Sequence, residues 1–260
     1  MATDFRRDGG RSATLGEAPH GDVPLRDALL GDVLREVLAG SVAGTGRPAL
    51  DIVDVGGGTG GLAVPLATLG HHVTVVDPSP DALAAAQRRA AEVSVRLTAV
   101  QGEAASLDSV AGVAAADLII CHNVLEYVDS PAEAMAAIAR VLRPSGTVSV
   151  LAANAVAAVL HRALAGRFAE ARRMLPGEGG GGNADLPRRF TLPELIALIE
   201  GAGLRAGAAH GLRIFGGLVP GALVDGDPGA AARLMALESA AATYPPLRDI
   251  AAQLHLLGHR

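Results

Sequence analysis

The stretch DIVDVGGGTGGLAV, residues 51–64, constrains the fold of this chain more than any other segment. Its first five residues form an apolar run of strand length, and residues 62–70 form a helical segment that ends at Gly70. At the end of a strand, only glycine lets backbone N–H groups and a helix N-terminus approach a ligand closely. We therefore expect a strand, a ligand-binding turn and a helix, the opening unit of an α/β sheet.

Strand-like and helix-like segments alternate over the first 155 residues. A helical pattern at 23–40 precedes the first strand. A β-branched strand at 71–77 leads into an amphipathic helix at 79–93, with Ser79 as its expected N-cap. Further strands are expected in VRLTAVQ, ADLIICHNV and TVSVLAAN, with the helix PAEAMAAIARVL and the turn RPSG between the last two. This alternation predicts a doubly wound, mostly parallel, Rossmann-like sheet.

The last third of the chain departs from this alternation. One helix is expected around 156–174, and it leads to the glycine-rich PGEGGGGNADLP at 176–187, which is typical of a mobile loop. A further helix is expected at 191–204, because Thr191 and Glu194 have the spacing of a capping box.

Composition restricts the classes of function. A chain of 260 residues that is 50% hydrophobic and 19% charged can bury one substantial core. The single Cys121 excludes an internal disulfide and a cysteine-based zinc site, and no spacing suggests a metal site. No apolar run is long enough to cross a bilayer, and the start of the chain lacks the apolar core of a signal peptide. We therefore expect a cytoplasmic protein with neither a metal nor a membrane partner.

The charge is distributed unevenly along the chain. The net charge is −5, yet residues 151–260 carry 11 Arg against 9 acidic residues. Every basic residue is an arginine, and six of them lie between residues 161 and 190. Such a cluster is usually a solvated face, but it is also compatible with an anionic partner.

The glycines alone fit two cofactor patterns. Gly56, Gly58 and Gly60 match GxGxG, which is typical of S-adenosylmethionine sites. Gly61 in place of Gly60 gives GxGxxG, which is typical of dinucleotide sites. Asp77 ends the second strand, where its carboxylate would accept hydrogen bonds from both ribose hydroxyls. Both cofactors contain an adenosine, so these residues leave the two open.

Residues outside the loop carry a family resemblance. Asp54 precedes Gly56 by two residues, and Arg26 lies in the helix ahead of the first strand. Together with DLIICHNVLEYV and LRPSG, these features make residues 25–155 resemble the class I S-adenosylmethionine-dependent methyltransferases rather than a dehydrogenase. The resemblance implies S-adenosylmethionine as the cofactor and the following binding residues: Arg26, Asp54, Gly56, Gly57, Gly58, Asp77, Glu103, Ala104 and His122.

The same resemblance assigns parts of the cofactor to individual residues. It implies that Gly56 and Gly57 lie against the methionine portion and that Glu103 and Ala104 flank the adenine.

Two residues have a plain structural interpretation as well. From spacing alone Arg26 is a surface residue of a helix, whereas the resemblance implies that its guanidinium meets the cofactor carboxylate. His122 is either a partly buried residue at a strand end or, by resemblance, a neighbour of the sulfonium. Cys121 and His122 cannot form a catalytic dyad, because neighbours on a strand point to opposite faces.

The downstream half is similar to the bacterial tRNA methyltransferases that esterify wobble 5-carboxymethoxyuridine. The similar segments are HNVLEYVDSP, the step from Asn154 to Ala155, LHRALAGRF, GLRIFGGL and ALES. The resemblance implies that Arg213 positions the acceptor carboxylate, with Asn154 and His161. We expect Arg213 in an extended segment, pointing away from its neighbours. A carboxylate with a pKa of about 4 is already ionised, so such a site needs positioning and no general base.

Two departures from this family keep an alternative open. Ala152 and Ala153 stand where the tRNA enzymes have aromatic residues, and Tyr127 stands in place of a Trp. A methyltransferase with a small-molecule acceptor is the alternative, followed by a non-catalytic protein that binds the cofactor.

The chain is expected to divide into three parts. Residues 1–20 form a flexible leader, 21–155 form the S-adenosylmethionine-binding core, and 156–260 add acceptor-binding helices and closing strands to the same domain.

Overall fold

The computed structural model describes residues 23–175, 187–227 and 229–260, with the side chains of 23–28 excepted. The leader expected at 1–20 lies outside the described residues, as does all but the last residue of the loop expected at 176–187.

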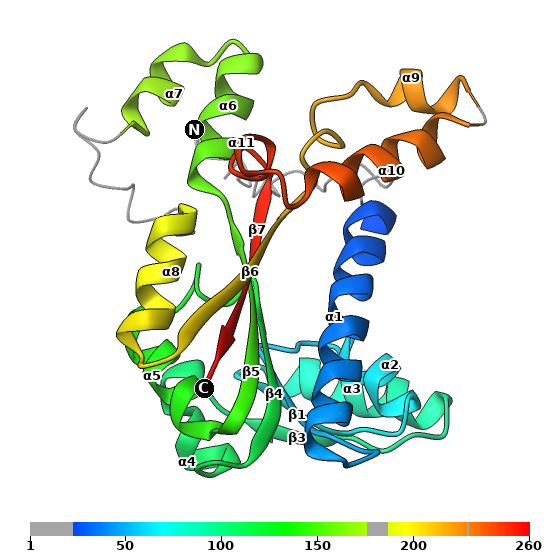
Figure 1. The fold of residues 1–260 in the computed structure, drawn as a ribbon, viewed down its shortest axis with the longest axis vertical. Coiled ribbons are helices and arrows are strands. Elements are labelled where there is room, and N and C mark those ends of the chain that lie inside the picture. The colour runs from blue at the N-terminus through cyan, green and yellow to red at the C-terminus, as the bar shows by residue number, and fades with distance from the viewer. Residues whose placement is uncertain (1–22, 176–186, 228) are drawn as a thin grey trace, which may run out of the picture.

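The described chain forms one mixed sheet with the strand order β3-β2-β1-β4-β5-β7-β6 (Figure 1). The strands are β1 (Asp51–Val55), β2 (His72–Asp77), β3 (Thr98–Gln101), β4 (Ala116–His122), β5 (Leu142–Ala153), β6 (Arg205–Leu212) and β7 (Gln253–His259). Strands β1 to β5 are parallel, whereas β7 pairs antiparallel with both β5 and β6. The expected doubly wound, mostly parallel α/β fold is confirmed.

Helices cover both faces of the sheet and enclose two apolar layers. These helices are α1 (Val23–Thr45), α2 (Ala63–Thr68), α3 (Pro80–Glu92), α4 (Leu107–Ala111), α5 (Pro131–Val141) and α8 (Leu192–Gly201), with a short 3-10 turn η1 (Ala104–Ser106) before α4. On one face, Leu38, Leu66 and Leu83 from the first three helices pack against Ile52 and Leu118. On the other face, α4, α5 and α8 pack against the alternate residues of the same strands. No helix in the described ranges is long and apolar enough to cross a membrane.

Local capping signals set several helix boundaries. The Ser79 hydroxyl accepts a hydrogen bond from the backbone of Ala82 at 3.3 Å, and the expected capping box of Thr191 and Glu194 begins α8. The expectation of a single helix over residues 156–174 is wrong. Gly166 adopts a φ of +74° there and divides the segment into two short helices.

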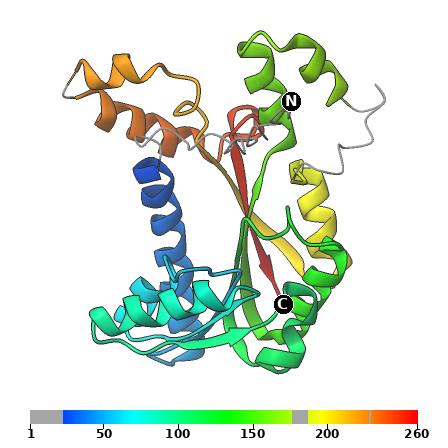
Figure 2. The same cartoon turned by 180° about the vertical axis from the view of Figure 1, so that it is seen from behind.

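Two helical arms stand above the end of the sheet. One arm is α6 (Ala155–Leu164) with α7 (Phe168–Arg173), and the other is α9 (Gly221–Asp225) with α10 (Ala230–Ala241). They lie on opposite sides of the short helix α11 (Pro245–Arg248) in Figure 1 and again from behind in Figure 2. The carboxyl ends of β5 and β6 lead into these arms, which places both arms beside the end of the sheet where ligands bind in this architecture.

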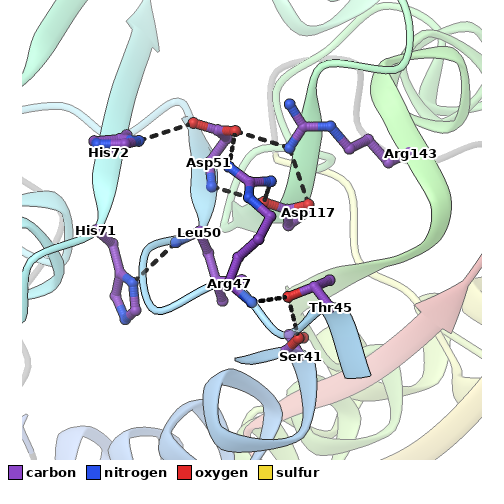
Figure 3. Close-up of polar contacts among 9 residues, drawn as sticks. All are labelled: Ser41, Thr45, Arg47, Leu50, Asp51, His71, His72, Asp117 and Arg143. Atoms are coloured by element: carbon purple, nitrogen blue, oxygen red, sulfur yellow. Dashed lines mark hydrogen bonds and ion pairs between the residues drawn. The ribbon is translucent and has the colours of Figure 1, made fainter. Parts of the chain in front are cut away.

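An ion-pair cluster ties the opposite end of the sheet together (Figure 3). Asp117 is 5% exposed and accepts hydrogen bonds from Arg47 at 2.9 Å and from the Asp51 backbone at 2.8 Å. Arg143 pairs with both carboxylates at 2.8 and 2.9 Å, and His72 contacts Asp51 at 3.1 Å. Burial acts to raise the pKa of Asp51, but Arg47 and Arg143 bring it down to about 2. The cluster therefore fixes the starts of four neighbouring strands.

Replacing Asp117 tests this cluster. We expect Asp117→Asn to lower the free energy of unfolding by about 1–3 kcal/mol, because two arginines lose a buried carboxylate. Asp108→Asn is the control, since the Asp108 pair with Arg140 is more exposed to solvent and should contribute much less to stability. Urea unfolding at pH 7 measures both. Equal effects of the two substitutions would contradict the structural role given to Asp117.

Candidate functional site

The glycine turn after β1 distinguishes between the two glycine patterns. Gly56, Gly58 and Gly60 have φ values of +64°, +54° and +77°, which side chains rarely adopt. A Cβ on Gly60 would also lie 3.1 Å from the Cβ of Ala86. Gly61 has an ordinary backbone and open space around it. The backbone thus requires glycine at the GxGxG spacing and not at the last position of GxGxxG.

Two further contacts fix this turn against its surroundings. A Cβ on Gly57 would lie 2.6 Å from Oδ2 of Asp54, and one on Gly56 would lie 2.5 Å from Val124 in the loop after β4. Asp54 is 4% exposed beneath the turn. Burial, with a smaller effect of the nearby Asp77, raises the pKa of Asp54 to about 7. The turn therefore lies directly on a carboxyl group that titrates near neutrality.

Asp77 connects the ends of three strands. Its carboxylate accepts hydrogen bonds from the backbone N–H groups of Gly58 and Ser79, both at 2.9 Å. Its backbone carbonyl accepts from Gly102 N–H at 3.2 Å, which holds the end of β3 beside β2. The expected ribose-binding residue therefore lies at the carboxyl end of β2, between the ends of β1 and β3, with its carboxylate oriented by backbone donors.

The remaining expected cofactor residues lie on the same edge, with one exception. Glu103 is exposed and immediately precedes η1, and Ala104 is buried as the first residue of that turn. His122 is half-buried at the end of β4. Arg26 belongs to α1, but its side chain lies outside the described residues.

Cys121 and His122 point to opposite faces of β4, as expected. The Cys121 thiol is fully buried within the apolar layer under α5, and burial raises its pKa. His122 faces the other layer, where its Nε2 lies 2.7 Å from the Ser149 hydroxyl.

This hydrogen bond begins a polar chain that the sequence did not predict. The Ser149 hydroxyl also lies 2.8 Å from Nε2 of His255, and Nδ1 of His255 lies 3.1 Å from Nδ1 of His210. Ser149 and His255 are fully buried, and burial lowers the pKa of His255 well below its usual value. His122 therefore contacts a hydrogen-bonded series of uncharged side chains, Ser149, His255 and His210, on strands β5, β7 and β6.

The structure places Arg213 differently from the extended segment expected for it. Strand β6 ends at Leu212, and Arg213 adopts a left-handed backbone with a φ of +59°. Leu212 and Ile214 are each 1% exposed, whereas Arg213 is half-buried. The expected extended conformation is wrong, because the chain turns sharply after β6 toward α9.

Two arginines lie close enough to act on His161, and a third lies close to one of them. Burial lowers the pKa of His161, and the charges of Arg213 and Arg162 lower it further. Burial likewise lowers the pKa of Arg189, followed by repulsion from Arg162, while Glu126 acts in the opposite direction. We call Arg162, Arg189 and Arg213 the arginine cluster. Its members come from α6, from the turn after β6 and from the segment before α8. Burial, with the charges of Arg213 and Arg162, leaves His161 neutral at pH 7.

Asn154 lies at the junction of β5 and α6, where its side chain is fully engaged. Its Oδ1 accepts from Val156 N–H at 2.9 Å and caps α6. Its Nδ2 donates to the carbonyls of Asp249 and Ala251 at 2.9 and 2.7 Å. Both N–H groups of this amide are therefore already engaged, and direct contact with an acceptor carboxylate would require one of these bonds to break.

Within the described residues, no group of three or more His, Cys, Asp or Glu is placed to hold a metal ion.

Comparisons with known proteins agree with this geometry. A family model described as a methyltransferase domain matches residues 53–150. A tRNA 5-carboxymethoxyuridine methyltransferase of Escherichia coli K12 is 31% identical over 199 residues, covering 74% of this chain and 72% of that protein. A ubiquinone biosynthesis O-methyltransferase of Burkholderia thailandensis is 33% identical over 162 residues, covering 61% and 66%. Magnesium protoporphyrin IX methyltransferase from Synechocystis PCC 6803, solved with bound SAH, shares the fold with a TM-score of 0.56, 18% identity and coverage of 95% and 90%.

Asp77→Asn tests the cofactor edge. The amide cannot accept the two backbone hydrogen bonds and ligand hydroxyls as a carboxylate does, so we expect S-adenosylhomocysteine to bind more weakly by about 1.5–3 kcal/mol. Asp81→Asn, on the exposed first turn of α3, should leave binding unchanged. Calorimetry measures both affinities. Unchanged binding by Asp77→Asn would remove Asp77 from the site.

The buried acid predicts a pH-dependent effect on stability. The folded pKa of Asp54 lies above its unfolded value of 3.8, so its ionisation costs stability increasingly as the pH rises toward about 7. We expect Asp54→Asn to gain stability relative to the wild type as the pH is raised from 5 to 8 in urea unfolding of the ligand-free protein. A constant difference between the two proteins across this range would contradict the raised pKa.

Proposed function

Because this chain belongs to the class I S-adenosylmethionine-dependent methyltransferases, we propose that it methylates the carboxylate of 5-carboxymethoxyuridine in tRNA. S-adenosylmethionine is the cofactor, and it supplies a methyl group bound to a positively charged sulfur. The observation that carries the choice of acceptor is that Arg162 and Arg213 lie beside a neutral His161, with Arg189 next to Arg162 and the turn after β6 against the His161 ring.

The charges of the site match the two ligands in this proposal. Asp54 and Asp77 lie under and beside the glycine turn, where a cationic cofactor would bind. The arginine cluster lies on the acceptor side, where an anion would bind. Opposite fields at the two halves orient a cation and an anion toward each other.

Methyl transfer to a carboxylate requires orientation of the two ligands more than it requires proton transfer. Methyl transfer is an in-line displacement, and the acceptor carboxylate is ionised at pH 7 without a base. A guanidinium fork fixes both the position and the rotation of a carboxylate, which is the role we assign to Arg213. The neutral imidazole of His161 supplies one further hydrogen bond to the acceptor. Asn154 holds the end of β5 beside the start of β7.

Exposed groups near the arginine cluster support a nucleic-acid acceptor. Arg167 and Arg173 are exposed on the α6–α7 arm, where phosphates can reach them. The rings of Tyr127 and Phe168 are 73% and 71% exposed. Unpaired bases stack on such rings, so these two offer the stacking surface that the alanines at the end of β5 lack.

A small-molecule acceptor is the alternative, and the similarity to ubiquinone biosynthesis O-methyltransferases favours it. The assay below separates the two, because a small-molecule enzyme transfers no methyl group to tRNA.

The direct test supplies purified protein with methyl-labelled cofactor and tRNA that carries the unesterified nucleoside. We expect labelled methyl ester from the wild type and a loss of about 100-fold or more in Arg213→Ala, with S-adenosylhomocysteine affinity within a few-fold of the wild type. Arg205→Ala is the control, since Arg205 is exposed at the start of β6, at the opposite end of that strand from Arg213. No transfer by the wild type rejects the tRNA acceptor, and full transfer by Arg213→Ala rejects the role of Arg213.

A further inference from the structure

The turn after β6 is held in a conformation that its sequence does not favour. Arg213 is a non-glycine residue with a φ of +59°, in the left-handed region that side chains disfavour. Such a residue persists only where the surrounding structure determines its conformation. The contacts around Arg213 show which groups do so.

A buried carboxylate grips the three residues that follow Arg213. Glu238 lies on α10 and is 4% exposed. Its Oε2 accepts from Ile214 N–H at 2.8 Å, and its Oε1 accepts from the N–H groups of Phe215 and Gly216, both at 2.8 Å. Successive N–H groups that converge on one anion form a backbone nest, and charge-assisted hydrogen bonds of this kind are strong.

The backbone of Arg213 itself is also hydrogen-bonded. Its carbonyl accepts from Ala252 N–H at 3.2 Å, and the Ala252 carbonyl accepts from Asn154 N–H at 3.1 Å. Ile214 packs against Ala251 and against α10. The turn is therefore held between α10 and the junction of β5 with α6, the same junction from which the helix carrying His161 begins.

We infer that Glu238 is a positioning residue for methyl transfer, acting through Arg213. This inference rests on the proposed role of Arg213 in binding the acceptor. Glu238 has no need to touch either ligand. By holding the N–H groups of the next three residues, it fixes the strained turn and keeps the Arg213 guanidinium near His161.

Kinetics of Glu238→Gln test the inference. The amide loses the charge and turns an N–H group toward backbone donors, so we expect kcat/KM for the acceptor to fall about 10- to 100-fold, with S-adenosylhomocysteine affinity unchanged. Glu238→Asp keeps the charge and should recover part of the loss. Ser239→Ala, the exposed neighbour on α10, is the matched control and should behave as the wild type.

A double-mutant cycle separates positioning from general damage. If Glu238 acts through Arg213, adding Glu238→Gln to Arg213→Ala should change the residual kcat/KM less than twofold. Losses that multiply, or a normal Glu238→Gln enzyme, would overturn the inference.

A second readout is independent of the acceptor. Arg213 lowers the pKa of His161, so displacing its guanidinium should raise that pKa. In an NMR titration with the His161 signal assigned through His161→Asn, we expect Glu238→Gln or Glu238→Asp to move the His161 pKa toward its value in Arg213→Ala. The His161 pKa in Ser239→Ala should equal that of the wild type.

If the wild type methylates no tRNA, the proposed function fails while this titration still decides the role of Glu238. A His161 pKa equal to that of the wild type in both folded Glu238 variants would refute it.

Discussion

The cofactor half of this molecule depends on one constraint. Backbone N–H groups at the carboxyl end of β1 must not be covered by side chains. Only a left-handed, glycine-bearing turn permits this, and its Gly58 N–H donates to the Asp77 carboxylate at 2.9 Å. The neighbouring elements fit closely around that turn, with Val124 against Gly56 and Asp54 beneath Gly57. This packing buries the Asp54 carboxyl group, and the burial raises its pKa to about 7.

The acceptor half is built by a different principle, since side chains far apart in sequence hold its backbone. Asn154 joins the end of β5 to the start of β7, and Glu238 clamps the turn after β6. These bonds bring the α6–α7 arm and Arg213 to one place above the sheet. In the proposed function, the arginine cluster binds an anionic acceptor, and the acidic residues at the glycine turn lie beside a cationic methyl donor.

The features that could be predicted from the sequence are those set by local signals. The alternation of strand and helix patterns predicted the parallel strands. The helix caps at Ser79 and Thr191 could also be predicted, because each depends on a hydrogen bond between residues three positions apart. The left-handed Arg213 could not be predicted, because Glu238, which holds the turn after it, lies 24 positions from Ile214. The contact of Ser149 with His255 spans 106 positions and depends on strand order, which a single sequence does not reveal.

The proposed acceptor is the carboxylate of a modified uridine in tRNA. Mass spectrometry of nucleosides from the tRNA of cells that lack this gene tests it most directly. We predict that the methyl ester of 5-carboxymethoxyuridine disappears, that the free acid accumulates, and that the wild-type gene restores the ester. An ester level that is the same with and without the gene would show that this protein does not esterify the nucleoside.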